Sequence, residues 1–348
     1  MEEIERKLFS KRKQNHIDLA SSSQFENKPR INLMDYFDYE PLMTNNVVEA
    51  GDLSQTFLNK TISYPFLISS MTASGEDSTE INKVLAQTAK HYNLPFALGS
   101  CRKFLFNNEA DESMLVRDEL GDGPLLANLG IAQVEELVES KELSRINKMM
   151  QVLNADALYI HINPMQEIHQ EEGDRYWSSP IELISKLVEE VDYPVLVKEV
   201  GQGMGPRSLE TLLNLNIYGI DSASLGGTNF TYLEKLRGKN KRFNGFIEKR
   251  DWNGASSIGH SIPEMINFLK NINNSDKVII LSGGVRSPED AFLYKQLLGE
   301  ENSLIGMAYP FLQAAQNGLP AVQEFFESFL YEYLIFNKFL HLKDKYNK

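Results

Sequence analysis

Short apolar runs recur eight times along the 348-residue chain, and stretches of helical length separate most of them. The runs are 65–70, 95–99, 125–130, 157–163, 194–200, 219–224, 277–283 and 303–308. Between them, apolar residues recur at three- and four-residue spacing, as at Ile81, Val84 and Leu85, which is the period of an amphipathic helix. Continuous apolar strands alternating with such helices predict a parallel sheet that helices cover.

Eight strand–helix units in one chain favour a (β/α)8 TIM barrel of the α/β class. A two-domain Rossmann arrangement is the alternative, but no linker separates two halves. We expect residues 1–60 to form an N-terminal arm and lead-in, and residues 61–348 to form the barrel. The long interval 225–276 suggests an extended active-site loop. Residues 321–342 predict an amphipathic helix, either the final barrel helix or a subunit contact.

Composition and charge narrow the possible functions. The formal net charge of −13 argues against binding to nucleic acid, so an anionic ligand would need a local cluster of positive groups. The amino terminus lacks the apolar core of a signal peptide, and no run approaches the roughly 18 apolar residues of a membrane span. We therefore expect a cytoplasmic protein with no membrane contact. Cys101, the single cysteine, excludes an intrachain disulfide.

Polar residues gather where the predicted strands end, which is where barrel enzymes place their active sites. The Gly283-Gly284 turn after the seventh run would be weak evidence by itself, because such turns are often only tight turns. Together with Gly306-Met307-Ala308 at the end of the eighth run, it predicts a phosphate site made of backbone amides.

Lys198 interrupts an otherwise apolar strand, where an unpaired ammonium group is costly. A salt bridge to Glu199 is geometrically poor because adjacent strand residues point to opposite faces. An inward Lys198 would instead favour an anionic ligand such as a reduced flavin.

The sequence HINPMQE at 161–167 follows the fourth strand directly. His161 and Asn163 share one face of the strand end, and Gln166 and Glu167 lie in the turn beyond. These side chains could form a loop network. They could also line a ligand site, in which Glu167 is a suitable Mg²⁺ ligand beside substrate phosphates.

Positive residues in the arm have two interpretations. Arg12, Lys13 and His16 could be a solvated charge run, or the arm could fold over a diphosphate and neutralise it. Arg102, after the second strand, would be a second cation.

These motifs, taken in order, resemble those of the type 2 isopentenyl diphosphate isomerases. The similarity runs from Arg12 to about Leu312 through RKQNHIDLA, PFLISSMT, ALGSCR, LLANLG, HINPMQE, PVLVKEVGQGMG, GGTNF, LSGGVR and GMAYPFL. Several of these motifs are general to flavin-binding barrels. The combination of Arg-Lys-x-x-His near the amino terminus with His-x-Asn-x-x-Gln-Glu is specific.

The resemblance implies a homo-oligomeric enzyme, a tetramer or octamer, that binds FMN and Mg²⁺ and has its flavin reduced by NADPH. It would interconvert isopentenyl diphosphate and dimethylallyl diphosphate, so its partner is a small prenyl diphosphate. Catalytic roles would fall to Gln166, His161 and Asn163, and the metal to Glu167. The substrate would contact Arg12, Lys13, Ser100, Arg102 and Gln166. The flavin would contact Met71, Thr72, Ser100, Asn128, Lys198, Thr228, Gly284, Arg286 and Ala308.

The chain departs from the family pattern at several positions. Ala223-Ser224 stands where Ser-Gly is usual, and Ala73-Ser74 stands where Gly-Gly is usual. We expect these changes to act on cofactor affinity and to leave the proton-handling residues intact. Two other functions stay open: an FMN-dependent oxidoreductase of the same barrel class acting on another small anionic substrate, and a non-catalytic scaffold.

Overall fold

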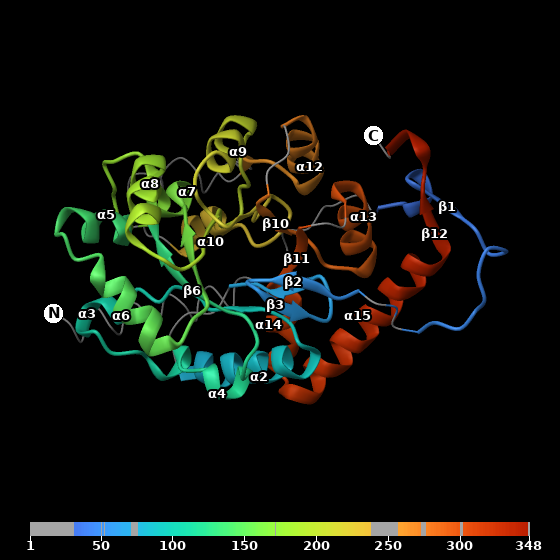
Figure 1. The fold of residues 1–348 in the computed structure, drawn as a ribbon, viewed down its shortest axis with the longest axis horizontal. Helices are drawn as coiled ribbons and strands as arrows, with labels where there is room; N and C mark the ends of the chain where they lie inside the picture. The colour runs from blue at the N-terminus through green and yellow to red at the C-terminus, as the bar shows by residue number, and fades with distance from the viewer. Residues whose placement is uncertain are drawn as a thin grey trace.

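Eight parallel strands close into a barrel in chain order (Figure 1). The computed structural model describes residues 31–49, 51, 53–70, 76–170, 172–237, 257–272, 276–299 and 302–346. The barrel strands are β4 (Phe66–Ile68), β5 (Phe96–Ala97), β6 (Leu125–Gly130), β7 (Ala157–His161), β8 (Val195–Lys198), β9 (Gly219–Asp221), β10 (Val278–Ser282) and β11 (Ser303–Met307). β11 pairs with β10 on one side and β4 on the other, which closes the sheet. Each predicted apolar run contains one strand, and the predicted fold class is confirmed.

Helices surround the strands (Figure 1). The helices are α2 (Glu76–Tyr92), α3 (Phe104–Asn107), α4 (Arg117–Leu120), α5 (Ile131–Glu139), α6 (Ser144–Leu153), α7 (Pro164–His169), α8 (Pro180–Glu190), α9 (Pro206–Leu213), α10 (Phe230–Arg237), α12 (Ile262–Asn271), α13 (Pro288–Leu298), α14 (Tyr309–Ala315) and α15 (Leu319–Phe339). Short 3₁₀ helices are η1 (Leu33–Asp35), η2 (Glu112–Met114) and η4 (Asp344–Tyr346). Among the described helices, none has both the length and the apolar character needed to cross a bilayer.

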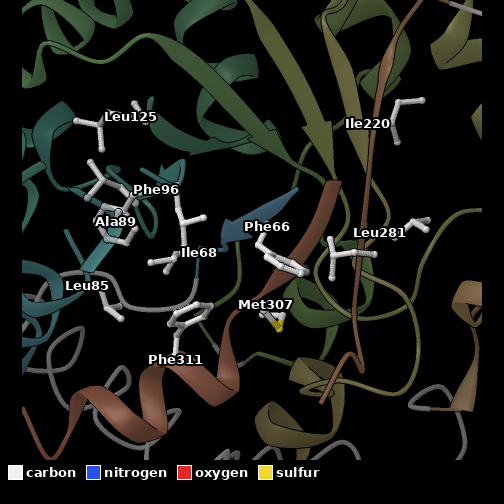
Figure 2. Packing of buried hydrophobic residues seen from close by; sticks show 14 of the residues in the cluster. Phe66, Ile68, Leu85, Ala89, Phe96, Leu125, Ile220, Leu281, Met307 and Phe311 are labelled. Atoms are coloured by element: carbon white, nitrogen blue, oxygen red, sulfur yellow. The ribbon is translucent and has the colours of Figure 1, made fainter. Parts of the chain in front are cut away.

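Alternation along each strand divides the core into two layers. On β8, Leu196 packs inside the barrel, whereas Val195 and Val197 pack outside it against the helices. Figure 2 shows part of the outer layer, where Phe66 of β4 and Phe311 of α14 belong to one buried cluster. Because the inner layer fills the barrel with side chains, a ligand can approach only at an end of the barrel.

The carboxyl-terminal segment differs from the prediction at its end. α15 is the final barrel helix, and Phe326, Phe329 and Tyr333 pack their rings against Phe66. The predicted helix over 321–342 is wrong for its last three residues, which form β12 (Leu340–Leu342). β12 pairs antiparallel with β1 (Phe37–Tyr39), so a partner far away in the sequence takes the backbone groups that a helix would otherwise satisfy.

A hairpin from the lead-in closes the amino-terminal end of the barrel. β2 (Gln55–Phe57) and β3 (Lys60–Ile62) pair antiparallel, and Phe57 and Ile62 are fully buried in the inner layer. The boundary that we expect between residues 60 and 61 falls inside β3, and the division into arm and barrel remains a proposal.

Asp156 links this hairpin to the barrel. Its carboxylate lies 2.5 Å from Lys60 Nζ, 2.9 Å from Arg117 Nη2 and 2.8 Å from the Leu125 amide nitrogen. Burial by itself raises the pKa of Asp156, but these three donors outweigh burial and hold the pKa below its usual 3.8. A lowered carboxyl pKa stabilises the fold above about pH 4, and this stabilisation is lost as the pH falls through the folded-state pKa.

Asp156→Asn is therefore expected to lower the free energy of unfolding at pH 7 by about 1–3 kcal/mol, because it weakens bonds to a charged acceptor. Urea unfolding of both proteins at neutral and acidic pH measures this. The gap between them should shrink toward about pH 3, and a gap of constant size would contradict the electrostatic origin.

Candidate active site

Inward-facing polar side chains form the last layer of the barrel at the carboxyl ends of the strands. Lys198 lies two residues after the inward Leu196 on β8, and Ser282 lies two residues after the inward Ile280 on β10. Asp221 ends β9 and is fully buried. Its carboxylate accepts hydrogen bonds from Tyr159 Oη at 3.0 Å and from the Ser282 hydroxyl. The barrel thus changes from apolar to charged at one end.

Lys198 carries the positive charge of this layer. Its side chain is buried, and Nζ donates to the main-chain oxygen of Glu199 at 2.7 Å. Burial lowers the pKa of Lys198, and the negative charges of Asp221 and Glu199 oppose that effect. A nearby anion would favour the charged ammonium further.

Glu199 points away from Lys198 and has a separate structural role. Burial raises the pKa of its carboxyl group. Two effects oppose that change: hydrogen bonds donated to the carboxylate by the main-chain amides of Val200, Gly201 and Gln202, and the positive charge of Lys198. The Glu199 carboxylate therefore shapes the turn after β8, and it forms no ion pair with the Lys198 ammonium group.

A pocket opens above this layer between the ends of β4, β8, β9, β10 and β11. Its lining includes Ser69, Ser70 and Ser224, whose buried hydroxyl oxygens have no hydrogen-bond partner within the described part of the chain. Buried polar atoms are normally satisfied, so three orphaned hydroxyls in one pocket indicate a polar ligand or water. The pocket also presents the Lys198 side chain.

Two glycines allow the segments that line the pocket to pack closely against each other. A Cβ atom on Gly283 would lie 2.2 Å from both the nitrogen and the oxygen of Ser224, and Gly283 has φ +96°. A Cβ atom on Gly306 would lie 2.6 Å from Ser69 Oγ. Glycine is required here by packing, and at Gly283 by backbone conformation as well.

The pocket brings together part of the predicted flavin set. Lining residues from that set are Lys198, Thr228, Gly284, Arg286 and Ala308. Asn128 and Ser100 are not in the lining: Asn128 bonds His161 and the Leu98 oxygen, while Ser100 accepts from the Arg102 amide. Met71 and Thr72 lie outside the described residues, as do Arg12, Lys13 and His16.

The HINPMQE segment places its polar side chains at the carboxyl end of β7 and in the first turn of α7. His161 Nδ1 lies 2.7 Å from Asn128 Oδ1. Asn163 Nδ2 donates to Gln166 Oε1 at 3.1 Å and to Glu167 Oε1 at 2.7 Å. α7 begins at Pro164, whose missing N–H is no loss at a helix start, and Gln166 and Glu167 in its first turn are buried. Asn163, Gln166 and the predicted metal ligand Glu167 therefore form one cluster, while His161 bonds Asn128 at the end of β7.

Two groups of residues in this cluster were not among our predicted site residues. Gln166 Nε2 donates to Glu234 Oε1 at 3.4 Å, and Arg237 Nη1 donates to Glu234 Oε2 at 2.6 Å. Glu234 is only 1% exposed. A carboxylate at a buried helix position is the signal that could have drawn attention to Glu234, because such residues are rarely buried without a partner.

The second group surrounds Arg102. Both terminal nitrogens of Arg102 contact Asp174, at 2.6 and 3.3 Å, and Gln133 Nε2 donates to Asp174 Oδ2 at 2.9 Å. Gln133 lies in the first turn of α5, so the rule that rim residues follow strand ends could have identified it. No local pattern connects Asp174 with Arg102.

Glu167 is the candidate metal ligand. Its Oε2 accepts from the Asp174 amide at 2.7 Å. No cluster of three His, Cys, Asp or Glu residues suited to a metal occurs in the portion of the chain described by the structure. A single carboxylate is compatible with Mg²⁺ only when waters and substrate phosphates supply the other ligands.

Comparisons with known proteins show which sequences and folds the chain resembles. No family model matches the chain. The isopentenyl-diphosphate delta-isomerase of Rickettsia felis is 32% identical over 328 residues, covering 91% of this chain and 88% of the relative. That of Pyrococcus furiosus is 33% identical over 271 residues, covering 77% of this chain and 66% of the relative.

Solved structures share the fold at low sequence identity. A mandelate oxidase mutant with a monooxide FMN adduct has a TM-score of 0.53 and 11% identity, covering 88% of this chain and 87% of that one. A flavocytochrome b2 mutant with pyruvate bound has a TM-score of 0.58 and 14% identity, covering 87% and 72%. Structural similarity at this level shows the barrel fold alone. The sequence relatives show the family. The chain belongs to the isopentenyl-diphosphate delta-isomerase family, as its resemblance to the type 2 members indicated.

Proposed function

We propose that this chain interconverts isopentenyl diphosphate and dimethylallyl diphosphate in isoprenoid biosynthesis, with reduced FMN and Mg²⁺ as cofactors. One observation carries the site assignment. Helix α10 links the glycine-lined pocket, which Phe230 and Leu233 of that helix help to line, to the Asn163–Gln166–Glu167 cluster, because α10 packs against α7 and its Glu234 bonds Gln166. Family membership supplies the reaction.

Residues of the pocket would hold FMN. Three orphaned hydroxyls offer hydrogen bonds, and the Gly283-Gly284 turn offers close approach of the backbone to the flavin phosphate. Lys198 would lie beside the flavin ring and favour a negative charge there. When bound, reduced FMN supplies an acid–base group next to the substrate double bond. The FMN adduct named for the mandelate oxidase neighbour supports the choice of cofactor.

Residues of the chain itself would provide a second route for proton transfer, besides the flavin. Moving a double bond by one carbon requires a proton added at one end of the allylic system and removed from the other. The amide of Gln166 is a poor acid, but its Nε2 faces Glu234 Oε1. Glu234 would thus take up and release a proton next to Gln166, while the hydrogen bond from Asn163 fixes the orientation of the amide. His161, held by Asn128 at the end of β7, would help to hold the diphosphate.

Glu167 and the cations would hold the diphosphate. Mg²⁺ would be bound by Glu167 together with phosphate oxygens. Ser100 and Arg102 would contact the substrate, and Arg12 and Lys13 from the arm would add two further positive charges. The resemblance also leads us to propose NADPH as reductant, a homo-oligomeric assembly and a cytoplasmic location.

The test is an anaerobic assay with FMN, NADPH, Mg²⁺ and labelled isopentenyl diphosphate. We expect dimethylallyl diphosphate to form, and to stop forming when FMN or Mg²⁺ is left out. A reduced, flavin-loaded protein that makes no product would contradict the proposal. An FMN-dependent oxidoreductase acting on another small anion would then be the better explanation, and consumption of the reductant with hydroxy or oxo acids would reveal it.

A further inference from the structure

The loop after α7 connects two groups that our proposed function assigns to the substrate. Asp174 uses both carboxylate oxygens for Arg102, with the shorter contact at 2.6 Å. The main-chain amide of the same residue donates to Glu167 Oε2 at 2.7 Å. One residue therefore contacts both the cation proposed for the diphosphate and the carboxylate proposed for the metal.

The Arg102–Asp174 pair is held in one geometry. About a quarter of each side chain is exposed, which limits screening by water. Gln133, which is buried, donates a third hydrogen bond to the Asp174 carboxylate at 2.9 Å. Two parallel contacts to a planar guanidinium fix its plane as well as its position.

The loop that carries Asp174 is itself anchored on both sides. Arg175 Nη1 donates to the Glu167 main-chain oxygen at 2.6 Å. Gly173 packs so closely that a Cβ atom there would lie 2.0 Å from the same oxygen. Beyond Asp174, the buried Glu135 carboxylate accepts from the amides of Trp177 and Ser178. These contacts place Asp174 independently of any ligand.

We propose that Asp174 is a positioning residue that presents the Arg102 guanidinium to the diphosphate in a fixed orientation. The inference rests on the proposed function. Arginine side chains lose rotamer freedom when they bind an anion, and a guanidinium that is already oriented loses less. The negative charge of Asp174 works against anion binding, so the proposal requires orientation to outweigh repulsion.

The test is a double-mutant cycle in the holoenzyme. Asp174→Asn keeps the main-chain contact to Glu167 and removes the charge that holds Arg102. We expect the KM for isopentenyl diphosphate to rise about 10–100-fold, as for other residues that orient a binding group, with kcat changed less than about threefold. In an Arg102→Ala background, the same substitution should add little, because the group it orients is absent.

Glu172→Gln is the matched control, because Glu172 lies in the same loop and pairs with Arg237 instead of Arg102. Its KM should match that of the native chain. Equal losses from Asp174→Asn with and without Arg102 would show a merely structural role and overturn the inference. A lower KM for Asp174→Asn would also overturn it, since Asp174 would then compete with the diphosphate for Arg102.

Calorimetry with inorganic pyrophosphate and Mg²⁺ separates this inference from the proposed function. A native protein that binds pyrophosphate more tightly than Asp174→Asn, yet makes no dimethylallyl diphosphate, would support the role of Asp174 and contradict the isomerase assignment. A native protein that isomerises the substrate, with Asp174→Asn equal to it in both KM and pyrophosphate affinity, would contradict the role of Asp174 alone.

Discussion

Glu234→Gln is expected to lower the turnover number by about 10²–10⁴-fold, the usual contribution of a group that transfers protons. Glutamine matches glutamate in shape but has one acceptor oxygen for the two donors Gln166 Nε2 and Arg237 Nη1, so the change removes the ability to hold a proton together with one of these hydrogen bonds. The affinity for FMN should stay close to that of the native chain, because Glu234 is not in the pocket lining. Steady-state kinetics with the flavin-loaded enzyme and a flavin titration measure both effects.

Two further variants separate proton transfer from packing. Glu172→Gln removes the other carboxylate that pairs with Arg237, but Glu172 is exposed, and its loss should change turnover less than about threefold. If Gln166 and Glu234 act as one unit, Glu234→Gln should cost little more in a Gln166→Ala background. Fully multiplicative losses would show that the two residues act independently.

Gly283→Ala is expected to lower FMN affinity at least about 100-fold and to destabilise the fold. The added Cβ would lie 2.2 Å from the main-chain nitrogen and oxygen of Ser224, so the carboxyl ends of β9 and β10 would have to move apart. The positive φ angle adds about 1–2 kcal/mol of backbone strain, and overpacking adds about 1–3 kcal/mol. Flavin fluorescence titration and thermal unfolding of the apoprotein measure the two consequences separately.

Gly299→Ala is the control for backbone strain. Gly299 also has a positive φ angle, +106°, but an added Cβ would have no neighbour within 4 Å. This variant should show the strain alone, with a small loss of stability and unchanged flavin affinity. If both alanine variants lower stability equally and neither changes FMN affinity, the contact between Gly283 and Ser224 has no role in shaping the pocket.

The barrel could be predicted from the chain because its signal is periodic. Each strand needs an apolar run and each helix an apolar stripe, and both patterns are local. The general position of the candidate site could be proposed in the same way, since polar residues such as Lys198 and Glu167 come at or just after strand ends, and all carboxyl ends of a parallel barrel meet at one rim. Helix and strand limits were less certain, as the strand at 340–342 shows.

The contacts between loops could not be predicted from the sequence and became known only from the tertiary structure. Asp174 reaches Arg102 across 72 residues, and Glu234 reaches Gln166 across 68. Such pairs produce no periodic pattern in the sequence, because the residues around each partner reflect only the turn or helix in which that partner lies. Sequence alone thus determined the barrel and the kinds of chemical groups at its rim. Which of those groups meet was decided by loop packing: the Glu135 carboxylate accepts from the amides of Trp177 and Ser178, and close packing of Gly173 against Glu167 fixes the loop that carries Asp174.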